Sequence, residues 1–385
     1  MTNVQTGYLI LTALLTGFYF WNNLRYLYWW KKIPAWEVPP NFQPQTSVSI
    51  LIPARNEAAA IGKCLRSILA QHFPIHLMEI IVIDDFSNDA TPEVVKSLQD
   101  SRIRYLALAD FVEENSLIAH KKKGIEAGIQ QATGTLIITT DADCYLPSNW
   151  LALVVSYYEA KDPAFIAAPV NFTREQNALE RFQSLDFNGM MLITGAGIQG
   201  RFMHMCNGAN LAYPRAVFEE VNGFSGINHL ASGDDMLLLQ KIAHRYPHRI
   251  GFIKNLAATA LTPPQSTWAS FFNQRLRWAS KSTAYREWGI TITLGLVFAF
   301  CVNILLSLTA TLWWGSFAFG LFALQLCTKS LADFLMLRKS TRFFNRADLM
   351  RSFVVSQLYH IFYIVVIGFL ANFKQSYEWK DRQVK

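Results

Sequence analysis

Short apolar runs alternate with amphipathic stretches between Val48 and Leu261, and longer apolar runs lie on both sides of this region. The short runs are rich in β-branched residues, which is typical of buried strands of a parallel sheet. They predict strands at Ser49–Ile52, Glu79–Ile83, Ile103–Leu106, Thr135–Cys144, Phe165–Val170, Ile250–Ile253 and Ala257–Leu261. Strands that alternate with helices predict an α/β fold with an open, mostly parallel sheet.

The amphipathic stretches have helical periodicity. They predict helices at Glu57–Gln71, Thr91–Gln99, Lys121–Ala132, Ser148–Ala160, Glu175–Ile193 and Met236–Ala243. Asp89 is a candidate helix cap, and Gly195, Gly197 and Gly200 should break the helix that precedes them. Cys206–Arg215 resembles a loop that enters a short strand.

The N-terminal apolar run, Gly7–Leu24, is followed by aromatic residues and then by Lys31 and Lys32. An aromatic belt before a basic pair is how a spanning helix meets the cytoplasmic face of a membrane. Residues 1–32 are therefore expected to be a retained transmembrane anchor with its N-terminus outside, since a basic n-region and a small-residue cleavage site are missing. Residues 33–47 form a proline-containing linker to a cytoplasmic catalytic domain at 48–265.

The C-terminal third has the same membrane character. Residues 266–288 mix aromatic and basic side chains and predict an amphipathic helix in the membrane interface. Residues 289–337 are long enough for two spanning helices, divided near Trp313 to Gly315. A basic cytoplasmic loop at 338–351, a last spanning helix at 352–371 and a tail at 372–385 follow, which gives four spans. The lysines of the tail fit poorly on the outer side.

Composition supports a membrane protein. Hydrophobic residues make up 51% of the chain and charged residues 16%, with the apolar excess at the two ends. The net charge of +7 is spread along the chain or lies beside apolar segments, which favours an anionic membrane face and a phosphorylated substrate over nucleic acid. Five cysteines without metal-ligand spacing predict reduced, structural thiols.

Two aspartates end the stretch Thr135–Cys144. Asp141 and Asp143 are two positions apart, so on an extended strand their side chains point the same way. Hard carboxylate oxygens at the carboxyl end of a parallel strand suit Mg²⁺ or Mn²⁺ shared with a phosphate ligand. The alternative is a solvated turn after the strand, where aspartate is common.

Five short motifs, in order, carry a resemblance to a known family. They are Pro53–Glu57 (PARNE), Asp84–Asp89 (DDFSND), Asp141–Asp143 (DAD), Gly233–Asp235 (GDD) and Gln274–Trp278 (QRLRW). Together they resemble the inverting glycosyltransferases of family 2 over roughly residues 48–278. The flanking apolar segments are similar to the membrane-embedded branch, which includes cellulose and hyaluronan synthases and ceramide glucosyltransferases. The resemblance implies a GT-A type fold, a nucleoside-diphosphate sugar donor and a divalent cation, Mg²⁺ or Mn²⁺.

The resemblance assigns donor-side roles to several residues. Pro53 and Ala54 would pack on the base, Glu57 would reach the ribose, and Asp85 would accept an N–H of a uracil ring. Asp84 is then the structural neighbour. Lys121, the best placed of Lys121–Lys123, would lie near the diphosphate, with Asp143 as metal ligand and Asp141 as ribose or second metal contact. From the residues alone, Arg55 can meet a nucleotide at the start of a helix. The alternatives are ordinary helix-start chemistry for Pro53–Glu57 and a solvated face for Lys121–Lys123.

Acceptor-side roles follow in the same way. Inversion needs a general base, and Asp235 matches the base of an acidic pair in which Asp234 replaces the usual Glu. The alternative is that both aspartates only match the charge of a helix N-terminus. Gln274, Arg277 and Trp278 share one helix face that can bind phosphate and a sugar or acceptor. Arg275 is expected at the surface or on lipid headgroups. Asn207, Gly208 and Asn210 resemble an acceptor-side loop, and His204 and His229 are interpreted as structural.

These features predict a membrane enzyme that moves a sugar from a UDP-sugar to a hydroxyl of a lipid or glycan acceptor, with a β-linked product. A processive polysaccharide synthase of the same family is the alternative within this class. From a different class, an inactive nucleotide-sugar-binding scaffold stays open, and a transporter is disfavoured because Asp333 is the one acidic residue within the predicted spans. The sugar, the acceptor and the oligomeric state are open at this point.

Overall fold

The computed structural model describes residues 1–114, 118–173, 175–280, 284–371, 377–379 and 382–384. The chain divides into two compact units, each assembled from separate segments. Met1–Lys32, Glu175–Gly197 and Gln265–Gln375 form one, and Ile33–Arg174, Ile198–Pro264 and Ser376–Lys385 form the other. We call them the helical unit and the sheet unit.

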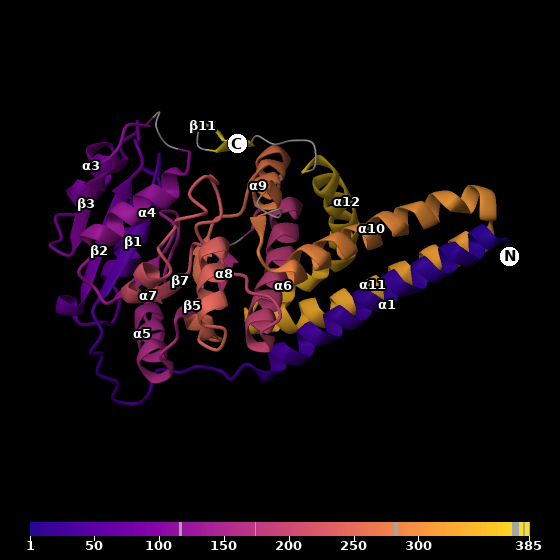
Figure 1. Ribbon diagram of the computed structural model, residues 1–385, viewed down its shortest axis with the longest axis horizontal. Helices are drawn as coiled ribbons and strands as arrows, with labels where there is room; N and C mark the ends of the chain where they lie inside the picture. The colour runs from indigo at the N-terminus through magenta and orange to yellow at the C-terminus, as the bar shows by residue number, and fades with distance from the viewer. Residues whose placement is uncertain (115–117, 174, 281–283, 372–376, 380–381, 385) are drawn as a thin grey trace. The chain divides into compact units, whose positions relative to one another are not determined.

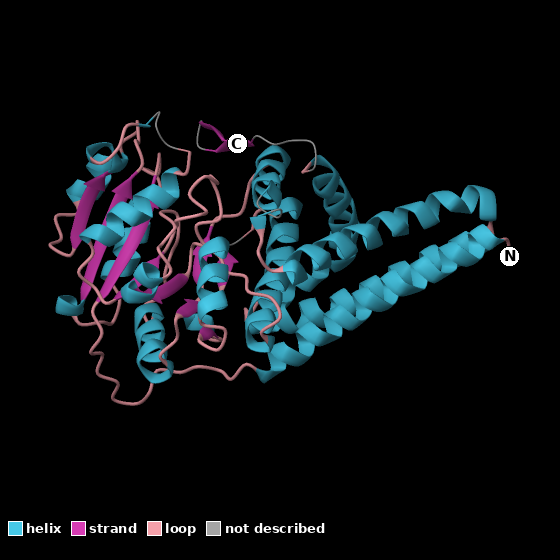
Figure 2. Ribbon diagram, viewed as in Figure 1, coloured by secondary structure: helices cyan, strands magenta, loops and turns pink. Residues whose placement is uncertain are grey.

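The main sheet of the sheet unit has seven strands within the described residues, in the order β3-β2-β1-β4-β7-β5-β8 (Figure 2). Their bounds are β1 Val48–Ala54, β2 Met78–Asp84, β3 Ile103–Ala107, β4 Leu136–Thr139, β5 Phe165–Ala167, β7 Leu211–Pro214 and β8 Ile250–Phe252. β1 to β4 are parallel, β7 is antiparallel to β4 and β5, and β8 is parallel to β5. The predicted α/β fold with a mostly parallel sheet is confirmed.

Helices join these strands, and β1, β2 and β4 are buried between them. The helices are α2 Ile61–Leu69, α3 Thr91–Ser97, α4 His120–Gln131, α5 Trp150–Lys161, α7 Arg215–Glu220 and α8 Met236–Arg245. α4 packs on β1 and β2 (Figure 1), so its first turn lies near the carboxyl ends of these strands. Ile50, Ile80 and Ile138, one from each central strand, are fully buried.

Several predicted boundaries were wrong. β4 ends at Thr139, and Asp141–Asp143 lie in a turn in which the Cys144 N–H donates to the Asp141 carbonyl at 3.1 Å. α2 begins only at Ile61, after Asn56 adopts a left-handed φ of 52°. Pro53 and Ala54 are therefore the end of β1, and Glu57 lies in a loop rather than at a helix N-terminus.

One predicted strand and one predicted helix also differ from the structure. The predicted strand Phe165–Val170 is divided between β5 and β6 (Val170–Phe172), and β6 pairs in parallel with β9 (Ala260–Thr262) in a separate small sheet. The predicted helix Glu175–Ile193 is α6, Ala178–Gly200, which continues through Gly195 and Gly197. A glycine inside a helix costs only about 1 kcal/mol, which tertiary packing can offset.

The helical unit holds the predicted apolar helices. Besides most of α6, it contains α1 Asn3–Lys32, α9 Trp268–Ser280, α10 Trp288–Trp314, α11 Ser316–Phe343 and α12 Phe353–Leu370, with a 3₁₀ segment, η6, at Ala347–Ser352. The predicted division near Trp313 to Gly315 is confirmed. α11 continues to Phe343, so the first six of the fourteen residues of the predicted basic loop are α-helical. Within the predicted amphipathic helix 266–288, the structure has α9 over Trp268–Ser280. The tail lysines 374, 380 and 385 lie outside the described residues.

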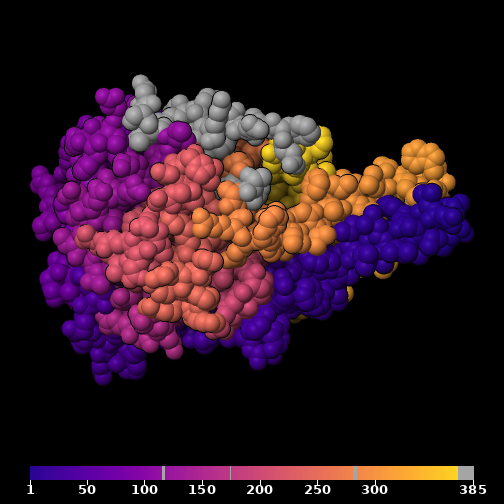
Figure 3. All heavy atoms as spheres, in the orientation of Figure 1, coloured from indigo at the N-terminus to yellow at the C-terminus, as the bar shows by residue number. Residues whose placement is uncertain are grey.

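Among the described residues, three helical segments are long and apolar enough to cross a membrane: Trp288–Trp314, Ser316–Phe343 and Ala347–Leu370. α1 is as long but is not among them. It packs on α10 and α11. Figure 3 shows α10, in orange, lying along the indigo α1. The fourth span thus stays a prediction.

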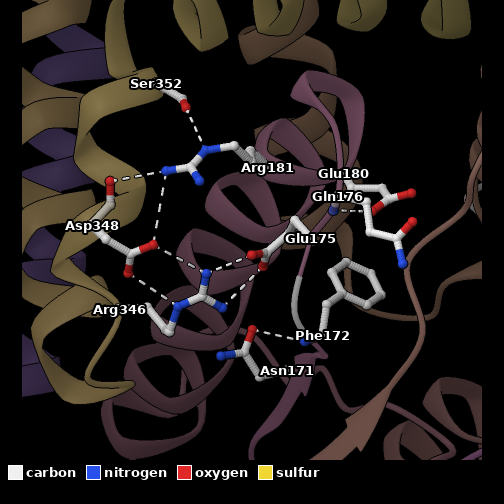
Figure 4. A network of polar contacts seen from close by, with 9 residues as sticks. All are labelled: Asn171, Phe172, Glu175, Gln176, Glu180, Arg181, Arg346, Asp348 and Ser352. Carbon is white, nitrogen blue, oxygen red and sulfur yellow. Dashed lines mark hydrogen bonds and ion pairs between the residues drawn. The ribbon is translucent and has the colours of Figure 1, made fainter.

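An ion-pair network ties the start of α6 to η6 (Figure 4). Arg346 contacts both carboxylate oxygens of Glu175, at 3.0 and 2.5 Å, and also pairs with Asp348 at 3.1 Å. Arg181 extends the network to Asp348 and to the Ser352 hydroxyl. Burial opposes ionisation of Glu175, but the hydrogen bonds from Arg346 hold its pKa below the ordinary value, so the carboxylate stays charged.

Gly134 gives a test of the sheet. Its N–H donates to the Ser49 hydroxyl at 2.8 Å, and a Cβ at this position would lie 2.5 Å from the Ser49 backbone nitrogen. Gly134→Ala should therefore force β4 away from β1 and lower the free energy of unfolding by about 1–3 kcal/mol, measured by the thermal unfolding midpoint. Gly17→Ala, where nothing lies within 4 Å, is the matched control. Equal midpoints for the two variants would contradict the packing described.

Candidate active site

The carboxyl ends of β1, β2 and β4 meet at one rim of the sheet. Ala54 of β1 is in register with Asp84 of β2, and the Asp85 N–H donates to the Ala54 carbonyl at 2.8 Å. Asp141 follows the end of neighbouring β4 by two residues. Parallel strands end at the same edge, so the topology delivers these side chains to one place.

Lys121, in the first turn of α4, is the electrostatic centre of this rim. Its ammonium lies 2.8 Å from Asp141 Oδ1 and 3.3 Å from Asp234 Oδ2. Burial alone would lower the pKa of Lys121, but Asp141, Asp234 and then Asp235 outweigh it and raise that pKa well above the ordinary value. We call Lys121, Asp141, Asp234 and Asp235 the Lys121 cluster.

The Cys64 thiol lies beside the turn that carries Asp141. Burial raises the pKa of Cys64, and the nearby carboxylates of Asp143, Asp141 and Glu57 raise it further. Its sulfur also donates to the Asp141 carbonyl at 3.6 Å. Cys64 and the Lys121 cluster thus both contact Asp141. All five cysteines fall within the described residues and are free thiols.

Gly208 lets the chain before β7 approach the cluster. Its N–H donates to Asp235 Oδ2 at 3.2 Å, and its carbonyl accepts from the Thr139 hydroxyl at the end of β4 at 3.1 Å. A Cβ on Gly208 would lie 3.3 Å from the Lys121 ammonium and 3.4 Å from Asp234 Oδ2. A side chain at position 208 would therefore crowd the Lys121 cluster.

Asp235 also begins α8. Its Oδ1 accepts from the Met236 N–H at 2.7 Å, so the carboxylate caps the helix while its other oxygen accepts from Gly208. The two interpretations of the acidic pair are thus not exclusive. Bonds to the backbone fix the orientation of the Asp235 carboxylate.

The Asp143 carboxylate contacts other groups than the Asp141 carboxylate does. It accepts from the Thr262 hydroxyl at 3.3 Å and from the Cys144 thiol at 3.8 Å. The side-by-side geometry expected from an extended strand is absent because this segment is a turn. The solvated-turn interpretation is correct for the backbone, and Asp141 keeps 39% of its side chain exposed.

The donor set of this rim fits a hard cation that is completed by a ligand. Within the described residues no group of three or more His, Cys, Asp or Glu side chains could enclose a metal ion. Two aspartates, Asp141 and Asp143, remain as candidate oxygen ligands. Mg²⁺ and similar ions commonly take one or two carboxylates and complete their shell with substrate phosphate and water.

The end of β2 holds a pair that the sequence reasoning missed. His120 Nδ1 lies 3.0 Å from Asp85 Oδ1, and both side chains are nearly buried. The sequence signal that could have pointed to this pair is the position of His120, directly before the lysine run at the start of a predicted helix. Asp84 is the structural neighbour, as predicted, since its Oδ2 accepts from the Tyr105 hydroxyl at 3.1 Å.

Two predicted site residues, Arg55 and Asn210, have core or loop partners instead. The Arg55 guanidinium donates to the Asp85 and Phe86 carbonyls at 2.8 and 2.9 Å, so it shapes the loop after β2 rather than reaching outward. Asn210 is 1% exposed and exchanges hydrogen bonds with Trp150, Pro169 and Ala258. This pairing contradicts an acceptor contact by Asn210. Asp89 accepts from the N–H groups of Thr91 and Ala58, the capping role considered above.

In the helical unit, α9 carries Gln274, Arg277 and Trp278, all partly buried, at helical spacing. The prediction for Arg275 was wrong. Arg275 is 4% exposed, its guanidinium pairs with Asp186 of α6 at 3.1 Å, and its Cζ lies 4.4 Å from the centre of the Trp278 ring. A buried carboxylate partner, 89 positions away, explains why the sequence reasoning placed it at the surface.

Known proteins share this fold. The mannosyltransferase PcManGT from Pyrobaculum calidifontis, solved in complex with GDP-Man and Mn²⁺, is similar with a TM-score of 0.54 at 19% identity, over 92% of this chain and 99% of that one. This likeness is one of fold, the GT-A fold. The sequence model described as Glycosyl transferase family 2 matches residues 49–221, and that of Glycosyl transferase family group 2 matches residues 136–372. The chain belongs to glycosyltransferase family 2.

Curated relatives cover parts of the chain. Glycosyltransferase AglE of Haloferax volcanii is 30% identical over 191 residues, 49% of this chain and 59% of AglE. The beta-monoglucosyldiacylglycerol synthase of Synechocystis is 26% identical over 247 residues, 61% of this chain and 48% of the synthase. This chain thus spans about half to three fifths of the length of these relatives.

Loss of the positive charge of Lys121 should abolish most of the activity of this site. In Lys121→Met, Asp141 and Asp234 face each other without a counter-charge, and we expect glycosyl transfer, measured as nucleotide release, to fall about 100-fold or more. Lys123→Met is the matched control, because Lys123 is more exposed and lies 3.7 Å from Glu126 on the same helix. If both variants keep wild-type turnover, the Lys121 cluster has no part in the activity.

Proposed function

We propose that this enzyme transfers a sugar from a nucleoside-diphosphate sugar, a UDP-sugar, to a hydroxyl group of a lipid or glycan acceptor at a membrane, with inversion at the anomeric carbon. The observation that carries the proposal is the Lys121 cluster, which joins Asp141 after β4 to the acidic pair before α8 through one ammonium. Donor-side and acceptor-side groups are thereby within a few ångströms of one another.

The donor side is built from the ends of β1, β2 and β4. Pro53 and Ala54 end β1 and would line the base, while the Asp85 carboxylate, oriented by His120, would accept an N–H of the base. Glu57 would reach the ribose. Asp141 and Asp143 would hold Mg²⁺ or Mn²⁺, and this cation, when bound, would neutralise charge on the departing diphosphate.

The acceptor side depends on Asp235. Its carboxylate is held by the Gly208 and Met236 N–H groups, and in our proposal it takes the proton of the acceptor hydroxyl as that oxygen attacks the anomeric carbon. The C1–O bond to the diphosphate breaks and UDP leaves, so the product is a β-linked glycoside. Lys121 keeps Asp234 paired, which leaves Asp235 as the base. In the helical unit, Gln274, Arg277 and Trp278 would serve the diphosphate or the acceptor.

A membrane acceptor is supported by the apolar helices and by the Synechocystis relative, whose name describes a glycolipid synthase. We propose that α1 is a fourth span and that the sheet unit is cytoplasmic. α1 is less apolar because it carries polar side chains that face its neighbours: the Tyr8 hydroxyl bonds Ser307 of α10 at 2.7 Å, and Tyr19 bonds Asp333 of α11 at 2.5 Å. Polar groups that are paired inside a bundle are compatible with a span.

Asp235→Asn tests the general base. Asparagine is also a good N-cap, so α8 should stay capped while the ability to take a proton is lost. We expect kcat to fall by about 10²- to 10⁴-fold with little change in the thermal unfolding midpoint, measured with purified protein and a panel of UDP- and GDP-sugars. Turnover that survives in Asp235→Asn would refute this mechanism.

Product analysis completes that test. A single β-linked sugar on the acceptor, seen by mass spectrometry, is the expected product. A ladder of lengths would instead indicate a processive synthase. Donor binding without any transfer or hydrolysis would indicate a binding scaffold.

Metal dependence can be measured apart from turnover. EDTA should weaken the binding of UDP, measured by isothermal titration calorimetry, and Mn²⁺ or Mg²⁺ should restore that binding. Asp143→Asn should reduce this cation effect, because one of two proposed carboxylate ligands becomes neutral. UDP affinity that is independent of cations and of Asp143 would contradict the proposed metal contacts.

A further inference from the structure

The chain between α7 and α8 reaches the active-site rim without helix or strand. It consists of turns and bends over residues 221–235 and ends with Asp234 and Asp235. We call residues 223–235 the acidic loop. A segment that carries catalytic carboxylates but lacks the hydrogen-bond ladder of a helix or a sheet needs another source of order.

Lys122 holds the acidic loop by hydrogen bonds to its backbone. Its side chain is 1% exposed, and its ammonium donates to the carbonyl oxygens of Ile227, Leu230 and Ser232 at 2.8, 2.5 and 2.7 Å. An ammonium carries three N–H donors, enough for one to each of these carbonyls. The contacts converge on the acidic loop just before the carboxylate pair.

The helical geometry of α4 separates two neighbouring lysines. Consecutive residues on a helix are rotated by about 100°, so Lys121 reaches Asp141 and Asp234 while Lys122 reaches the backbone of the loop. A buried ammonium is unfavourable unless polar groups surround it, and here carbonyl dipoles do so. One helical turn thus binds both the carboxylates and the loop that carries them.

A second lysine holds the other end of the acidic loop. Lys241 of α8 donates to the Gly223 carbonyl at 2.6 Å and to the Ser225 carbonyl at 2.8 Å. The loop is therefore bound through its backbone from α8 at its start and from α4 at its end. The Lys122 contacts are the nearer to Asp235.

We propose that Lys122 is a positioning residue: it orders the acidic loop so that the Asp235 carboxylate is presented to the acceptor hydroxyl. This role rests on the proposed function of Asp235 as general base. Lys122 itself touches backbone oxygens of the loop and acts on the reaction through Asp235.

The test compares Lys122→Met with Lys123→Met in the full-length enzyme. Hydrogen exchange of residues 223–235 should become faster in Lys122→Met, and kcat should fall about 10- to 100-fold, because small misplacement of a catalytic group has effects of this size. The KM for the donor should change little, since the donor side is formed by β1, β2 and β4. Lys123→Met should match the wild type in every reading.

Two further variants keep the test decisive. Lys122→Arg keeps a cation with N–H donors and should recover part of both the protection and kcat, and it replaces Lys122→Met should that variant not fold. Lys241→Met should loosen exchange mainly at 223–225, with a smaller loss of kcat.

The proposal is overturned if kcat is unchanged while exchange in the loop becomes faster, if exchange is unchanged, or if the loss lies in the donor KM. Failure of the proposed function would look different. In that case the wild-type enzyme itself would transfer no sugar, while the exchange measurement would still show whether Lys122 orders the acidic loop.

Discussion

The ammonium of Lys121, partly buried between carboxylates, makes the candidate active-site rim electrostatically feasible. Asp141 and the pair Asp234–Asp235 come from segments about ninety positions apart in sequence, and like charges this close repel strongly where water is scarce. Lys121 lies between them, 2.8 Å from one carboxylate and 3.3 Å from another. Because Lys121 belongs to α4, and α4 packs on β1 and β2, the sheet fixes where the carboxylates meet.

The antiparallel strand β7 contributes to the same arrangement. It runs against β4, with Leu211 in register with Thr139. The amino end of β7 therefore lies at the carboxyl ends of the parallel strands, and the segment that enters it brings Gly208 to the Lys121 cluster. Because β7 runs in the reverse direction, the loop that precedes it lies at the same rim as the loops that follow the parallel strands.

The fold and the carboxylates of the rim were predictable because they follow from local patterns and a topological rule. Apolar runs marked β1, β2 and β4, and aspartates after such strands must share an edge. The roles of Arg275, Asn210 and Arg55 were not predictable in this way. Each is decided by a distant partner, such as Asp186 for Arg275 or Trp150 for Asn210, which no local window contains.

The turn at Asp141–Asp143 shows a second limit. Apolar pattern marks where a strand begins, but its end depends on when pairing with neighbours stops, and β1 pairs with β4 only up to Thr139. The helix α6 shows the converse, since its glycines are poor helix formers that its tertiary surroundings nevertheless keep helical.

The hydrogen bonds of α1 have a consequence for biosynthesis. Tyr8 and Ser307 are 299 positions apart, and Tyr19 and Asp333 are 314 apart. A ribosome adding about 5–20 residues per second needs roughly 15–60 s to reach those partners. Throughout that interval the first helix to be made carries polar groups whose final partners have not yet been synthesised, so these contacts of α1 can form only after α10 and α11 have been made.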